Sequence, residues 1–329
     1  MIRKKSVNDK EPWFLYKANL RTKTFVIIGI SVILIVSILI SSLFIGEIPT
    51  SFASANQMPS FQHLFGTDWM GRDMFLRTIA GLGLSLTVGI IASGVSTLIS
   101  IILGLFSSFN RFADEAVAGI IDLFGSIPHI LLIILISIMF GGGTFGVIMG
   151  VGLTHWTPLA RVLRSEVKEI KTKEYVHLSQ NLGKSKVWIA TKHILPLIVS
   201  QIIVGVILMF PHAIMHEAAI TFLGFGLPPH EPAIGVILSE SMQYLSSGYW
   251  WLAFYPGVSL LIVVLLFDLI GENVDVQILK TQKNLQKKRK TLIFCIFLIV
   301  IFVKVCYNHM DNKLLCLLMR THMNFRLQM

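Results

Sequence analysis

Charged side chains are few in this chain of 329 residues. Asp, Glu, Lys and Arg together make up 14% of the sequence, against about 25% in an average soluble protein. Hydrophobic residues make up 54%, and the mean hydropathy is +0.72. This balance argues against a soluble globular fold and predicts an integral membrane protein.

Cysteine is also scarce, and its placement excludes two kinds of site. The three cysteines, Cys295, Cys306 and Cys316, all lie in the last 35 residues. An odd, clustered set provides no disulfide framework, and none of its spacings is the two-residue spacing of a zinc site.

A nucleotide-binding loop is incomplete. Gly183-Lys184-Ser185 resembles the end of a phosphate-binding loop, but the glycine needed five residues earlier is replaced by Leu178. The sequence therefore predicts no nucleotide site in this chain.

A zinc-protease motif is incomplete in the same way. His216-Glu217 could begin such a helix, but Ile220 stands where the second histidine is required. No catalytic residue, cofactor or metal ligand set is therefore predicted. His212 and His216, four residues apart, leave weak metal binding open as an alternative to helix packing or a pore-facing role.

Long apolar runs dominate the chain up to residue 270. The runs occupy residues 25–45, 85–106, 117–140, 147–160, 197–222 and 250–270. A helix of about 20 residues crosses a bilayer, so each run is predicted to span the membrane or nearly so. For 25–45 the alternative is a signal peptide, but its apolar core exceeds the 7–15 residues usual for one. We expect a retained anchor.

Lys and Arg are distributed very unevenly between the segments that join these runs. Segments 1–24, 107–116, 161–193 and 271–290 hold seven, one, eight and six, whereas the alternate segments hold only Arg72 and Arg77. Cytoplasmic loops are enriched in positive charge, so the N-terminus is predicted to be cytoplasmic. The net charge of +10 thus has a membrane explanation, and no nucleic-acid partner is predicted.

These patterns give a predicted organisation of the whole chain. It consists of a cytoplasmic tail (1–24), a first transmembrane helix (25–45), an extracytoplasmic loop (46–80), a core transmembrane domain (81–271), a basic cytoplasmic segment (272–290) and an atypical tail (291–329). The atypical tail is open to three interpretations, namely a marginal seventh helix, an interfacial segment or an appended sequence.

The longest polar interruption, residues 161–196, is the segment that we expect to contact a partner in the cytoplasm. Within it, a short helix is predicted, because a helix-compatible run ends at a glycine that can adopt the left-handed capping conformation. Its residues are Lys173, Glu174, Tyr175, Val176, His177, Leu178, Ser179, Gln180, Asn181, Leu182 and Gly183.

Ionisable residues inside the apolar runs are candidates for lining a transport pathway, because exposing them to lipid is costly. The candidates are Asp122, His155, His212, His216 and Glu217. Structural pairing within the bundle is the alternative for each of them.

Several segments, taken in order, resemble one known family over about residues 20–280. They are Phe-Gly-Thr-Asp-Trp-Met-Gly-Arg-Asp at 65–73, Ser-Ile-Pro at 126–128, Trp156 with Ala160-Arg161, Glu-Ala-Ala-Ile-Thr-Phe-Leu-Gly at 217–224 with Pro228-Pro229, and Trp250-Trp251. The chain resembles the inner-membrane permease subunits of bacterial peptide and nickel ABC importers. The family's Glu-Ala-Ala in its cytoplasmic loop is His177-Leu178-Ser179 here, although Gly183 is in place.

The resemblance implies an all-α membrane protein with six transmembrane helices of the type I ABC importer permease fold. The helix at 173–183 would be a cytoplasmic coupling helix between spans 4 and 5. The implied function is ATP-driven import by alternating access in the bacterial inner membrane, with ATP hydrolysis in a partner chain and no enzymatic activity in this one.

The implied partners are a second permease subunit that forms a heterodimer with this chain, two cytoplasmic ATPase subunits, an extracytoplasmic substrate-binding protein and membrane lipid. Short peptides, transition-metal ions (nickel, cobalt or zinc) and metal–chelate complexes are all open as cargo. His155, His212 and His216 slightly favour metal. An intramembrane metalloprotease and a non-transporting membrane scaffold are the alternative functions.

Overall fold

The computed structural model describes residues 13–282, and within these residues every regular element is helical. Tertiary contacts group the chain up to Asp275 into one unit, to which the description below refers. Beyond it, the described residues 276–282 form the end of one helix. The predictions for residues 1–12, 283–290 and the tail 291–329 lie outside the described residues.

Within residues 13–282, four helices are long and apolar enough to cross a membrane. They are α1 (Trp13–Phe44), α2 (Met74–Phe106), α9 (Leu195–Phe222), whose span includes the short turns before it, and α11 (Trp251–Gln282). A bent pair, α3 and α4, raises the number of candidate spans among the described residues to five. The predicted helices at 25–45, 197–222 and 250–270 are confirmed as helical.

The second long helix begins earlier than the sequence indicated. Residues 46–80 were predicted to be loop, but apart from the short 3-10 turn Phe52–Ser54 the non-helical segment ends at Asp73. The Asp73 carboxylate accepts hydrogen bonds from the backbone N–H groups of Phe75 and Leu76. This cap satisfies two otherwise unpaired donors at the helix start.

The apolar run 117–140 does not form the single helix that was predicted. It contains the end of α3 (Arg111–Ser126) and all of α4 (His129–Met139), and the two axes differ by 97°. Ile127 and Pro128 lie at the bend. Proline lacks the N–H that would continue the helix and forces the residue before it out of the helical region.

The run 147–160 is also interrupted. It is divided between α5 (Gly143–Gly152) and α6 (Trp156–Lys171). The hydroxyls of Ser96 and Ser100 on α2 donate to the carbonyl oxygens of Gly152 and Trp156, at 2.7 and 2.8 Å. A break among apolar helices is tolerated when neighbouring side chains satisfy the freed backbone groups.

The polar stretch after this break is largely helical. The first part of the predicted loop 161–193 continues α6, which is followed by α7 (Glu174–Asn181), α8 (Lys186–Ile189) and a π-helical turn (Ala190–Ile194) that leads into α9. The segment 223–249 joins the apolar runs 197–222 and 250–270 and was therefore expected to be a loop, but it contains α10 (Ile234–Leu245).

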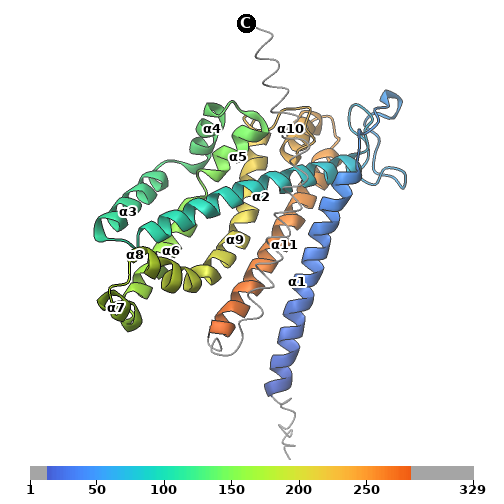
Figure 1. Cartoon of the computed structure of the whole chain (residues 1–329). Coiled ribbons are helices and arrows are strands. Elements are labelled where there is room, and N and C mark those ends of the chain that lie inside the picture. Colours follow the sequence, from blue (N-terminus) through green and yellow to red (C-terminus); the bar gives the residue numbers. More distant parts are fainter. Residues whose placement is uncertain (1–12, 283–329) are drawn as a thin grey trace, which may run out of the picture. The chain divides into compact units, whose positions relative to one another are not determined.

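The centre of the unit is α2, which packs against α1, α5, α6 and α9 (Figure 1). Small residues allow close approach at these contacts. A Cβ at Gly89 would lie 2.7 Å from a side-chain atom of Ile214 on α9, and one at Gly104 would lie 3.0 Å from Leu163 on α6. Gly94, which lies between them on the same helix, faces no such neighbour.

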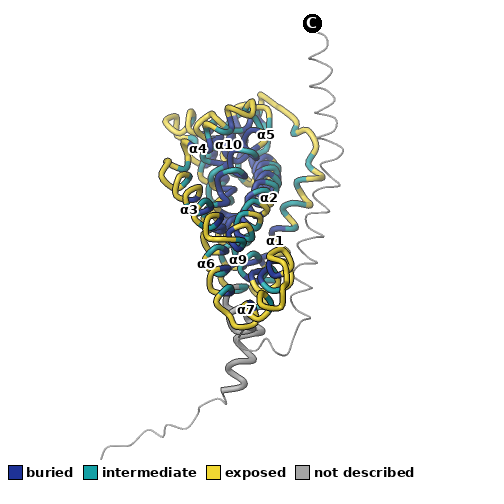
Figure 2. The backbone as a smooth tube through the Cα atoms, turned by 60° about the vertical axis from the view of Figure 1, so that its left-hand side comes forward, coloured by how far each residue is buried: buried dark blue, intermediate teal, exposed yellow. Residues whose placement is uncertain are grey.

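Burial and the positions of the helices distinguish two ends of this unit. Helices α4, α5 and α10 lie at one end and α7 lies at the other (Figures 1 and 2). Figure 2 shows that the buried backbone is concentrated around α2, α5 and α10, whereas α7 is mostly exposed. The end that contains α7 is therefore the more exposed of the two.

Candidate functional site

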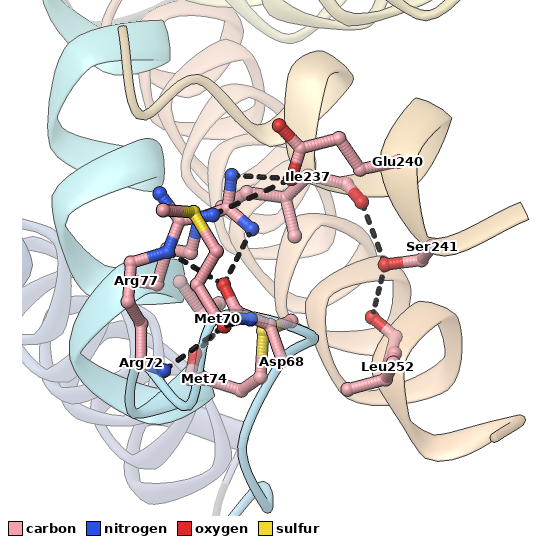
Figure 3. Close-up of polar contacts among 10 residues, drawn as sticks. Asp68, Met70, Arg72, Met74, Arg77, Ile237, Glu240, Ser241 and Leu252 are labelled. Carbon is pink, nitrogen blue, oxygen red and sulfur yellow. Dashed lines mark hydrogen bonds and ion pairs between the residues drawn. The ribbon is translucent and has the colours of Figure 1, made fainter. Parts of the chain in front are cut away.

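Three groups of residues have the geometry of functional positions, and the first joins the loop at 46–73 to the bundle. Asp68, which is almost fully buried, accepts hydrogen bonds from the backbone N–H groups of Met70 and Arg72, both at 2.9 Å. Its second oxygen accepts from Arg72 Nε at 2.7 Å and from Arg77 Nη1 at 3.0 Å. Figure 3 shows both arginines converging on this carboxylate.

Arg77 extends the network to α10. Its other Nη lies 2.6 Å from Glu240 Oε2, so the buried guanidinium bridges two carboxylates from different parts of the chain (Figure 3). The adjacent Ser241 hydroxyl lies 2.9 Å from the carbonyl oxygen of Leu252 in α11. These contacts, here called the Asp68–Arg77–Glu240 network, hold the loop, α2, α10 and α11 in one arrangement.

The second group is α7, the helix predicted at 173–183. Its single fully buried side chain, Val176, packs into an apolar cluster formed with α6, α8 and α9. Among the members of that cluster are Leu163, Val167, Ile194 and Ile198. Val176 therefore connects α7 to α6 and α9 through packed side chains.

The C-terminal half of α7 is fixed at two points. Gly183 has φ +77°, and the N–H groups of Gly183 and Lys184 donate to the carbonyls of Gln180 and Ser179, so the glycine closes the helix as predicted. The hydroxyl of Ser179 lies 2.9 Å from His193 Nε2 in the π-helical turn. The helix is thus linked to the start of α9 by a polar contact as well as by Val176.

The outer face of α7 is apolar and exposed. Leu178 and Leu182 are 60% and 69% exposed, and Tyr175 is 41% exposed. Next to this face, Lys173 donates to Glu169 at 2.9 Å. This hydrogen bond raises the pKa of the Lys173 ammonium and lowers the pKa of the Glu169 carboxyl, so both groups stay charged beside the apolar face at neutral pH.

The third group is a cluster of three histidines, His129, His155 and His216, here called the histidine cluster. They come from the start of α4, the turn between α5 and α6, and the C-terminal third of α9. One ring nitrogen from each lies within 4.8 Å of those of the other two. Such an arrangement can hold a metal ion.

The other residues predicted to line a pathway are not members of this cluster. Glu217 is fully buried, and one carboxylate oxygen accepts from the Thr221 hydroxyl at 3.0 Å. Asp122 is exposed on α3, where its carboxylate lies 3.6 Å from Arg161. His212 is exposed on α9, one turn before His216. The structure thus brings together two of the five candidates, His155 and His216.

Sequence reasoning missed two of the residues in these groups. His129 follows the Ser-Ile-Pro segment directly, but nothing local indicates that it meets two other histidines. Glu240 lies in the segment that was predicted to be a loop, and only the formation of α10 directs it toward Arg77.

Comparison with known proteins identifies related sequences over most of the described region. A family model described as "Binding-protein-dependent transport system inner membrane component" matches residues 96–280. The matched residues include α7, the histidine cluster and α10.

Two bacterial permeases illustrate the relationship. The oligopeptide transport system permease protein OppC of Bacillus subtilis (strain 168) is 34% identical over 226 residues, which cover 68% of this chain and 74% of that protein. The dipeptide transport system permease protein DppC of Alkalihalophilus pseudofirmus is 33% identical over 270 residues, which cover 80% of this chain and 88% of that protein.

A solved structure resembles the fold. An inward-facing form of the MetNI methionine ABC transporter matches with a TM-score of 0.52 at 20% identity, over 62% of this chain and 97% of the matched chain. At that identity the likeness concerns the fold alone. The prediction of an ABC importer permease fold is therefore confirmed.

Proposed function

Because the chain belongs to the family of binding-protein-dependent transport system inner membrane components, we propose that it is the permease subunit of an ATP-driven importer of short peptides. Members of this family are transport permeases rather than enzymes. The choice of peptide cargo is supported by the oligopeptide and dipeptide permeases named above.

Coupling to ATP hydrolysis is assigned to α7. The observation that carries this proposal is the combination of an exposed apolar outer face, at Leu178 and Leu182, with an inner face anchored by Val176. A rigid helix held in this way transmits movement from a bound ATPase into α6 and α9, where a flexible loop would absorb it. The ATPase shifts the pathway only by binding one conformation more tightly than the other.

The proposed assembly contains this chain, a second permease subunit, two cytoplasmic ATPases and an extracytoplasmic binding protein. The cluster of Lys and Arg between 161 and 193 supports a cytoplasmic position for α7 and for the N-terminus. Six crossings remain the proposed topology, with α3–α4 and α5–α6 each serving as one interrupted crossing. Alternating access opens the pathway first to the binding protein and then to the cytoplasm.

A transition-metal ion or metal chelate is a second candidate cargo. The specific observation in its favour is the histidine cluster, since imidazole is a preferred ligand for nickel, cobalt and zinc. The test is uptake of a radiolabelled dipeptide, and separately of radiolabelled nickel with and without a chelator, in a strain that lacks this chain. Loss of uptake that the intact gene restores supports import of that cargo. Unchanged uptake of every cargo would contradict the transport proposal.

Replacing Leu178 with lysine is expected to weaken attachment of the ATPase. Burying a lysine at an apolar contact removes a favourable contact and adds a desolvation cost, so uptake should fall by about tenfold, the equivalent of 1.4 kcal/mol. The measurement is labelled uptake together with the amount of ATPase that copurifies with the permease. Thr172→Lys, which adds the same charge in the turn before α7, is the control, and an equal loss in both variants would contradict a specific contact at Leu178.

A further inference from the structure

The histidine cluster is assembled from parts of the chain that are distant in sequence. The ring centroids of His129 and His155 are 4.5 Å apart, and each is 4.9 Å from the ring centroid of His216. The ring planes meet at 57–74°, so the rings do not stack face to face. Among the described residues, no hydrogen bond joins any two of them.

His155 is held in the form that a metal ligand requires. Its Nδ1 lies 3.1 Å from the carbonyl oxygen of Val151, and a carbonyl can only accept, so the proton is on Nδ1. The lone pair is therefore on Nε2. A backbone carbonyl that fixes the tautomer in this way is the usual outer partner of a metal-binding histidine.

The available nitrogen of His155 has no partner in the protein. Nε2 is buried, and no described residue forms a hydrogen bond to it. Leaving a buried polar atom unpaired costs about 1–3 kcal/mol, so the arrangement is explained most simply by a ligand that the nitrogen binds. Glu217 differs in that one of its carboxylate oxygens accepts from the Thr221 hydroxyl at 3.0 Å, although its Oε2 also has no hydrogen-bond partner among the described residues.

The spacing suits a metal ion after a small contraction. Nitrogen ligands at 2.0–2.1 Å from a tetrahedral ion are about 3.3 Å from one another, and the three ring nitrogens lie within 4.8 Å. Small rotations of the rings about their side-chain bonds would close this difference. His129 lies directly after Pro128, and His155 directly before α6, so both rings project from the ends of helices.

The cluster is open on one side. His129 and His216 are only half-buried, and their neighbours Ile127 and Met215 are 41% and 49% exposed. Three protein ligands with an accessible further position form an open metal site, unlike the closed four-ligand sites that serve only structure. The remaining position is free for water or for a donor atom carried with the ion.

We propose that His129, His155 and His216 of this chain bind a divalent first-row transition-metal ion, such as nickel, cobalt or zinc. That the ion is cargo rests on the second candidate cargo proposed above, whereas binding of the ion to these residues does not depend on a transport function. Imidazole is a ligand that suits these ions, and the three side chains come from elements on both sides of two helix breaks. The affinity for a cargo ion would therefore depend on the relative positions of α4, α6 and α9.

The test is binding of nickel to the purified full-length chain in detergent, measured by calorimetry, with cobalt absorption as a second probe. One ion per chain is expected, and the single variants His129→Gln, His155→Gln and His216→Gln should each bind at least about tenfold more weakly. His230→Gln, which changes an exposed histidine outside the cluster, is the control and should bind as the unaltered chain does.

Two further measurements distinguish a variant that fails to fold from one that has lost a metal-binding side chain. Nickel, but not magnesium, should raise the unfolding temperature of the unaltered chain, and the variants should unfold at the same temperature as that chain when no metal is present. Absence of nickel binding in the unaltered chain, or binding by the three cluster variants as tight as that of the unaltered chain, would overturn the site. These measurements need no ATPase or binding protein, so such a failure is distinct from failure of the uptake experiments described above.

Discussion

Deleting residues 176–180 is expected to abolish coupling between ATP hydrolysis and transport while the protein still inserts into the membrane. The deletion removes Val176, which anchors α7 in the cluster beneath it, and Leu178 from the exposed face. Coupling free energies between sites are about 1–3 kcal/mol, so cargo uptake should fall by about 5- to 150-fold. Labelled uptake and ATP hydrolysis are measured on the same reconstituted importer.

A milder change tests the same helix without removing residues. Gly183→Val places a β-branched side chain at φ +77°, where left-handed backbone costs about 1–2 kcal/mol, and so distorts the end of α7. Gly119→Val is the matched control, because Gly119 lies in a regular helix and a Cβ there would meet nothing within 4 Å. Normal uptake by the deletion variant would show that α7 does not carry the coupling.

Replacing Arg77 with methionine is expected to lower the free energy of unfolding more than any other substitution proposed for this chain. The side chain is 5% exposed and bridges Asp68 and Glu240, so its removal leaves the buried Asp68 carboxylate and the half-buried Glu240 carboxylate each short of a partner. Removing one partner of a buried ion pair costs about 3–5 kcal/mol. Unfolding of the purified protein in detergent, by heat or denaturant, measures the change.

The control is a pair of the same chemistry on the surface. Arg111 and Glu115 form an ion pair at 2.7 Å, but their side chains are 92% and 61% exposed. Arg111→Met is therefore expected to leave stability unchanged within error, because exposed pairs contribute little. If both substitutions reduced stability equally, the Asp68–Arg77–Glu240 network would not be the feature that holds the loop to the bundle.

The parts of the structure that were predictable from the sequence depend on local signals. The helix at α7 follows from helix-compatible residues closed by Gly183, and α9 and α11 follow from long apolar runs. The break at Pro128 also has a local signal. Hydropathy alone hides it, because the residues on both sides are apolar and a window that averages over them reads one continuous span.

Other features depend on contacts between distant residues. The break between α5 and α6 is supported by Ser96 and Ser100, whose bonds to Gly152 and Trp156 each cross 56 positions of sequence. Helix α10 forms where Ile234 and Ile237 become fully buried. A local pattern cannot report such partners, and the segment was therefore predicted to be a loop.

The histidine cluster shows the same limit at a candidate site. His155 and His216 were predicted as candidates because they are ionisable residues in apolar runs. His129 became a candidate only when the bend of 97° between α3 and α4 placed its ring beside the other two. The chemistry of each residue was visible in the sequence, whereas their proximity depends on the fold.

The central claim is that α7 lies in the cytoplasm, where an ATPase can bind it. The direct measurement is labelling of Gln180→Cys by a thiol reagent that does not cross membranes, in a chain whose three native cysteines are replaced by serine. Phe61→Cys in the loop before α2 serves as the opposite marker. We expect Gln180→Cys to be labelled in inside-out vesicles but not in spheroplasts, and Phe61→Cys to show the reverse. Labelling of Gln180→Cys from the outside of spheroplasts would contradict the account.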